Sequence, residues 1–125
     1  MPCPSDLDRC FQLFEEEGYF ILPHFFERAE IASLQERIDQ IMLGTADVDY
    51  EQIWMQLDTD SGKYEDLSWG GNGFQGATLD YRKIQGLEAD QRFLDFITSS
   101  FFVQLCERVY GPNQPITSFR TMFMN

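Results

Sequence analysis

The strongest constraint on the fold of this chain is the spacing of apolar residues in two long segments near its start. The first apolar stripe consists of Leu7, Cys10, Phe11 and Phe14, which share one face of a helix. The second consists of Ile31, Leu34, Ile38, Ile41 and Met42. Gly18 and Gly44 follow the two stripes, and glycine commonly ends a helix. The sequence therefore predicts helices over about 6–17 and 28–43.

Shorter patterns of both kinds follow these helices. Apolar or alternating runs at 19–22, 81–85 and 116–124 predict strands. The segments 89–97 and 100–110 again have helical spacing, and Gly-Pro ends the second of them. Helices and strands alternate without an internal repeat, and the length suits one domain. We therefore expect an α+β fold in a single domain.

The segment 45–80 is different, because it is rich in Asp, Gly, Ser and Thr and has weak periodicity. We interpret it as a long irregular excursion with one helical turn within 50–57. Its Gly71–Gly76 stretch matches the spacing of a dinucleotide-binding loop. That loop needs a strand before it and a helix after it. The flanking residues favour neither, so we interpret the glycines as an ordinary loop.

The acidic composition excludes several classes of function. The formal net charge is −12, which disfavours binding to nucleic acid and to anionic membranes. The sequence contains neither an apolar run of membrane-spanning length nor a signal peptide, so the cytoplasm is the expected location. The three cysteines include no Cys-x-x-Cys pair, which argues against a zinc site and a disulfide framework.

The predicted strand 116–124 has an unusual setting. It is rich in Phe and Met, and no further predicted strand follows to cover its edge. Unpaired apolar edges invite association with other chains, and three strands make a thin sheet. We therefore expect either that the chain is a fragment of a longer protein, which we favour, or that a partner covers the open edge.

Two stretches of the sequence resemble the phytanoyl-CoA dioxygenase family. The first reads FEEEGYFILPHFFERAEIASLQERI, a helix, Gly-Tyr, a short strand, a turn and a long helix. The second, more specific stretch reads YRKIQGLEADQRFLDFITSSFFVQLCERVYGPNQPITSFRTMFMN. It has a lysine-bearing strand, two helices, Gly-Pro, and a strand ending in Thr-Met and Asn. Together they cover most of the chain outside 45–80.

This resemblance implies the N-terminal part of an Fe(II)- and 2-oxoglutarate-dependent dioxygenase. The implied fold is a double-stranded β-helix, a cupin-like jelly roll with N-terminal helices packed on its sheet. Lys83 and Met122 match cofactor-binding positions of the family, on the strands around the 2-oxoglutarate pocket. Without the resemblance, Lys83 would be interpreted as a solvated lysine or a partner of Asp80, and Met122 as core filling.

The chain differs from the family in the residues that would bind the iron. The family holds Fe(II) with two histidines and one carboxylate, whereas this sequence has one histidine, His24. We therefore assign no catalytic and no metal-binding residue, and we do not expect these 125 residues alone to be active. Three hypotheses stay open: an oxygenase fragment whose small-molecule substrate is undefined, a non-catalytic interaction module derived from that fold, and an unrelated small acidic domain.

Overall fold

The fold belongs to the α+β class predicted from the sequence, with helices and a three-stranded antiparallel sheet. The computed structural model describes residues 4–63, 65, 73–115, 117 and 120–125. The chain divides into two compact units, Met1–Ser33 and Leu34–Asn125. None of the described helices is both long enough and apolar enough to cross a membrane.

The first unit contains helix α1, Pro4–Glu17. The Gly18 N–H donates to the Phe14 carbonyl, and Gly18 has a left-handed φ of 83°, so the glycine ends the helix as predicted. The Phe20 ring then turns back edge-on against Phe11 at 5.8 Å and Phe14 at 6.4 Å between ring centroids. This return contact closes the turn after α1.

The prediction of a strand at 19–22 is wrong. The structure has no regular element there, and the described residues provide no neighbouring strand to share a hydrogen-bond ladder with it. Pro23 lacks an N–H, and His24 adopts a left-handed φ of 55°, so the segment bends where a strand would have to continue. Aromatic and β-branched content alone does not make a strand without a partner.

Helix α2, Arg28–Met42, confirms the second predicted helix. It ends where expected, because the Gly44 N–H donates to the Ile41 carbonyl and the Thr45 N–H to the Gln40 carbonyl. The later residues of its apolar stripe, Ile38, Ile41 and Met42, are at most 2% exposed. They form the helical side of the core of the second unit.

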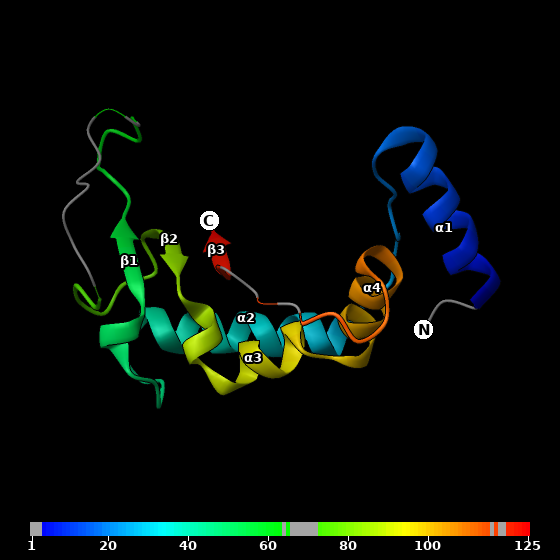
Figure 1. Cartoon of the computed structure of the whole chain (residues 1–125). Coiled ribbons are helices and arrows are strands. Elements are labelled where there is room, and N and C mark those ends of the chain that lie inside the picture. Colours follow the sequence, from blue (N-terminus) through cyan, green and yellow to red (C-terminus); the bar gives the residue numbers. More distant parts are fainter. Residues whose placement is uncertain (1–3, 64, 66–72, 116, 118–119) are drawn as a thin grey trace. The chain divides into compact units, whose positions relative to one another are not determined.

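Three antiparallel strands form the other side of that core: β1 (Trp54–Leu57), β2 (Tyr81–Gln85) and β3 (Met122–Met124). The strand order is β1-β2-β3, so β2 is central. Figure 1 shows the strands with the later part of α2 passing beneath them. The buried core consists of Ile38, Ile41, Met42, Ile53, Met55, Tyr81, Ile84 and Leu87.

A β-bulge explains how β2 fills this core. Gln56 pairs with Lys83, but the next residue, Leu57, pairs with Tyr81. The extra residue in β2 changes the side to which the strand points its side chains. Tyr81 and Ile84 would point to opposite faces of a regular strand, yet both are 0% exposed on the core face.

Helix η1 (Tyr50–Gln52) precedes β1, whereas η3 (Leu87–Ala89), α3 (Gln91–Ile97) and α4 (Ser100–Tyr110) lie between β2 and β3. The predicted helices at 89–97 and 100–110 are thus confirmed to within two residues. In the excursion, the predicted helical turn at 50–57 is only partly right. It begins as η1 and continues as strand β1, because Ile53 and Met55 reach the core.

Two further predictions are only partly described by the structure. Of the predicted strand 116–124, the segment 122–124 is β3, 120–121 is irregular, and 116, 118 and 119 lie outside the described residues. Of the glycine stretch 71–76, the first two residues also lie outside. After it the chain enters strand β2, so the helix that a dinucleotide site requires is not formed.

Candidate functional site

The two predicted site residues lie on adjacent strands. Lys83 is the middle residue of β2, where its Cα partners are Gln56 on β1 and Met124 on β3. Met122 begins β3 and is paired with Gln85. Paired residues point to the same side of a sheet, as do residues two apart along a strand. Lys83 and Met122 are therefore diagonal neighbours on one face.

We call this surface the lysine face; it consists of Trp54, Gln56, Lys83, Gln85, Met122 and Met124. The opposite face carries Met55, Ile84 and Phe123, which belong to the core or pack against it. On the lysine face Gln56 is 3% exposed, whereas Met122 is 43% and Met124 61% exposed. The face thus combines one cation with amide groups and accessible, polarisable side chains.

The Lys83 ammonium lies beside an aromatic ring. Its Nζ lies 5.9 Å from the centroid of the Trp54 ring, which is within the range of a cation–π contact. Among the described residues no carboxylate forms an ion pair with it. Asp80, the partner considered from the sequence, accepts instead from the Thr78 hydroxyl at 3.0 Å. An ammonium held in this way can still bind an anionic group from solution.

Two hollows formed by described residues of the second unit do not include the predicted site residues. One, of about 650 Å³, is lined partly by Asp58, Asp60, Asp80 and Asn125. The other, of about 780 Å³, is largely apolar and lies along α3 and α4, with Cys106 in its wall. Successive side chains of a strand point to opposite faces of the sheet. Asn125 follows Met124, so it belongs to the face opposite Lys83.

The described residues contain no group of three His, Cys, Asp or Glu side chains that could hold a metal ion. His24 lies in the first unit. The residues present therefore do not fit the two-histidine, one-carboxylate iron site of the family. That none of these 125 residues binds a metal stays a prediction, and it concerns this chain alone.

Sequence reasoning missed the role of β1 in building the lysine face. From the sequence, Trp54 and Gln56 were assigned only to the irregular excursion 45–80, and neither was assigned to a site. The available signal was the stretch 53–57, in which apolar Ile53, Met55 and Leu57 alternate with Trp54 and Gln56. Because the surrounding residues are acidic and glycine-rich, this short alternation was interpreted as part of the irregular segment.

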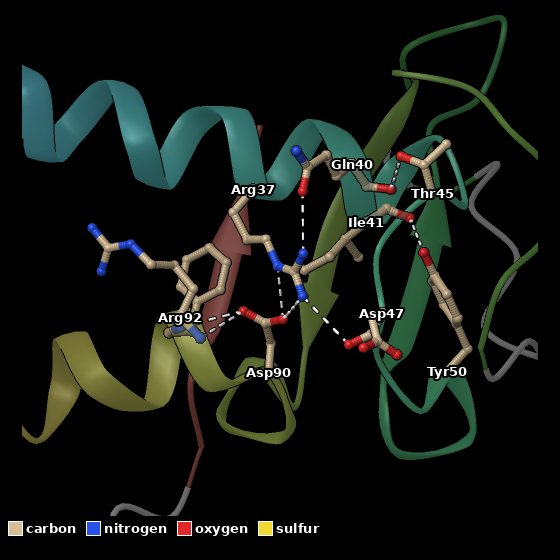
Figure 2. A network of polar contacts seen from close by, with 9 residues as sticks. Arg37, Gln40, Ile41, Thr45, Asp47, Tyr50, Asp90 and Arg92 are labelled. Carbon is tan, nitrogen blue, oxygen red and sulfur yellow. Dashed lines mark hydrogen bonds and ion pairs between the residues drawn. The ribbon is translucent and has the colours of Figure 1, made fainter.

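A buried ion pair was also missed, and Figure 2 shows it from close by. The Arg37 guanidinium on α2 donates from Nε to Asp90 Oδ1 at 2.8 Å and from Nη1 to Gln40 Oε1 at 3.1 Å. Its Nη2 also reaches the Asp47 carbonyl at 3.4 Å. The hydrogen bond to Asp90 raises the pKa of Arg37, so the guanidinium stays charged.

The other carboxylate oxygen of Asp90 caps α3. Oδ2 accepts from the backbone N–H groups of Arg92 at 3.1 Å and Phe93 at 3.3 Å. Asp is a preferred N-cap residue, and its position just before the apolar-periodic residues of 91–97 was the signal available in the sequence. Because no buried side-chain nitrogen or oxygen of the described residues lacks a hydrogen-bond partner, we interpret this network as a clamp between α2 and α3 and not as a reactive group.

Comparison with known proteins adds no family to this picture: no protein-family model, no curated protein and no solved structure matches the chain.

Proposed function

We propose that the lysine face is part of the 2-oxoglutarate-binding wall of an Fe(II)-dependent dioxygenase of the phytanoyl-CoA dioxygenase type. In this proposal the chain supplies N-terminal helices and the first strands of a jelly-roll oxygenase domain. Lys83 forms an ion pair with one carboxylate of the co-substrate. Met122 packs beside it, and Trp54 holds the ammonium in place.

The observation that supports this proposal is the position of Lys83 and Met122. They are 39 positions apart in the sequence, and each was chosen by its match to a family position. The strand register makes them diagonal neighbours on the same face. A lysine with no carboxylate partner among the described residues, beside exposed methionines, suits a small dicarboxylate better than it suits a structural ion pair.

The role of these residues would be binding and orientation. Because this chain has one histidine, the iron ligands would have to come from residues outside these 125. Iron, when bound in a complete domain of this type, supplies the oxygen chemistry. Lys83 would hold one carboxylate of the co-substrate, and the amide groups of Gln56 and Gln85 lie beside it on the same face.

The decisive experiment measures 2-oxoglutarate binding through the fluorescence of Trp54. The chain has two tryptophans, so Trp69→Phe leaves Trp54 as the single reporter, 5.9 Å from the Lys83 ammonium. We expect a saturable change with a dissociation constant of roughly 6–80 mM, since one charge-assisted contact contributes about 1.5–3 kcal/mol. Sodium chloride at equal ionic strength corrects for general salt effects on this acidic protein.

Lys63 is the only other lysine in the sequence, which makes it a matched control. Lys83→Met should weaken 2-oxoglutarate binding roughly tenfold or more, the equivalent of losing about 1.4 kcal/mol, while Lys63→Met should leave it unchanged. If the change in fluorescence does not saturate, or if both variants respond alike, the lysine face is not a dicarboxylate site and the proposal fails.

A further inference from the structure

The side chains of the lysine face form two rows across the sheet, because paired residues lie directly opposite each other. The first row consists of Trp54, Gln85 and Met122, and the second of Gln56, Lys83 and Met124. Gln85 is thus the central residue of the first row, as Lys83 is of the second. The two residues are two positions apart along β2, so their side chains leave the strand on the same side.

The Lys83 side chain leans out of its own row toward the first. Its Nζ lies 5.9 Å from the centroid of the Trp54 ring, and Trp54 is paired with Gln85 and not with Lys83. Residues directly opposite each other on antiparallel strands have Cβ atoms about 4.5–5.5 Å apart. The ammonium therefore lies beside the row that carries the Gln85 amide.

The Gln85 amide is available to a bound molecule. Gln85 is half-buried, and among the described residues no hydrogen bond reaches its side chain. Since no buried side-chain nitrogen or oxygen of those residues lacks a partner, this amide is open to solvent. Gln56, the other amide of the face, is 3% exposed and already takes part in a contact within the chain. Gln85 is therefore the amide that a ligand can reach.

We propose that Gln85 is a second binding residue of the lysine face and that its Nε2 donates to the carboxylate held by Lys83. This inference rests on the function proposed above and adds a residue that the family resemblance did not indicate. An ammonium donates from one centre, and an amide N–H donates along one direction. Each donates to a different oxygen of the same carboxylate, so the pair fixes the plane of that group as well as its position.

The charge of the lysine face favours a carboxylate as the group that binds. Acidic residues outnumber basic ones by 21 to 9 in the chain, yet the face has one lysine and no carboxylate of its own. Its other members are one tryptophan, two amides and two methionines. The positive charge is thus not neutralised within the face, and an anionic ligand supplies the missing partner.

Gln85→Leu tests the contact, because it removes the amide and keeps a similar volume. We expect the dissociation constant of 2-oxoglutarate, measured by Trp54 fluorescence in the Trp69→Phe chain, to rise about tenfold, the equivalent of about 1.4 kcal/mol. Gln114→Leu is the matched control, since Gln114 is an exposed amide of the same unit. It should leave the dissociation constant unchanged.

Gln85→Glu separates a contact with the ligand from a role in supporting the strand. Glutamate keeps the size of glutamine but places a carboxylate beside the Lys83 ammonium, where it competes with the ligand. We therefore expect Gln85→Glu to weaken binding more than Gln85→Leu does. If Gln85 only supported the strand, glutamate, the closer match in shape, would have the milder effect. Circular dichroism checks that both variants are folded.

The role of Gln85 and the function of the lysine face fail in different ways. If Lys83→Met abolishes binding but the folded Gln85 variants bind as the unchanged chain does, the role of Gln85 alone is refuted. A glutamate variant that binds more tightly than the leucine variant refutes it as well. If the unchanged chain does not bind 2-oxoglutarate, the function proposed for the face fails, and the role of Gln85 fails with it.

Discussion

The Asp90 carboxylate links helices α2 and α3 of the second unit through a single side chain. One oxygen accepts from Arg37 on α2 and the other from the first N–H groups of α3. The Asp90 side chain is 0% exposed, and that of Arg37 is 22% exposed. A carboxylate so deeply buried depends on these donors, because water cannot replace them.

We therefore expect Arg37→Met to lower the free energy of unfolding by about 3–5 kcal/mol, the cost of leaving a buried charge without its partner. Urea denaturation measures this loss. Arg28→Met is the control, since Arg28 is an exposed arginine in the same helix and its loss should change stability by no more than about 0.5 kcal/mol. Equal effects of the two variants would contradict the assigned role of the clamp.

At the scale of elements, the turn between β2 and η3 depends on one glycine. Gly86 has a left-handed φ of 81°, and a Cβ at this position would lie 2.5 Å from the Gln52 carbonyl oxygen. This close approach brings the start of β1 next to the end of β2. Any other residue would meet both an unfavourable backbone conformation and a backbone atom that cannot move aside.

Gly86→Ala should therefore lower stability by more than the roughly 1–2 kcal/mol of a left-handed alanine. Gly62→Ala separates the two costs, since Gly62 also has a left-handed φ, of 66°, but nothing within 4 Å of its Cβ position. We expect a clearly lower urea midpoint for Gly86→Ala than for Gly62→Ala. Identical midpoints would show that the contact with Gln52 is not tight in solution.

The elements also show which patterns in the sequence were informative. Helices α2 and α4 were predicted almost to the residue, because a long apolar stripe and a glycine stop are both local signals. Strand β1 was missed, and the segment 19–22 was wrongly predicted as a strand. Both errors have one cause: a short strand exists only where another strand pairs with it, and that pairing is not encoded locally.

For the molecule as a whole, the ionisation of two tyrosines makes the free energy of unfolding depend on pH in the alkaline range. Burial raises the pKa of both Tyr50 and Tyr81 above the ordinary value. Tyrosines of the unfolded chain lose their protons at about pH 10. Above that pH the folded chain therefore binds more protons than the unfolded chain. The stabilisation that the two raised pKa values contribute is fully present below about pH 10. It is lost as the pH rises through the pKa values of the tyrosines in the folded chain.

We expect the free energy of unfolding to fall steeply above about pH 10, where ionisation also adds to the net charge of −12. Tyr81→Phe should be less stable at neutral pH by about 1–3 kcal/mol, because the Gln75 N–H and the Gly76 carbonyl lose their partner. Its alkaline slope should be shallower. Tyr19→Phe, at a position 64% exposed, should retain the original slope; a similar slope in all three proteins would contradict this assignment.

The sequence by itself determined the α+β class, the long helices and the glycines that end them, because these depend on neighbours within a few residues. It also indicated Lys83 and Met122 through resemblance to a family. Only the tertiary structure decided that these two share a face with Trp54 and Gln56, that a bulge turns Tyr81 into the core, and that Arg37 meets Asp90. Those outcomes depend on the register between strands and on contacts between residues far apart in the sequence, which no local pattern specifies.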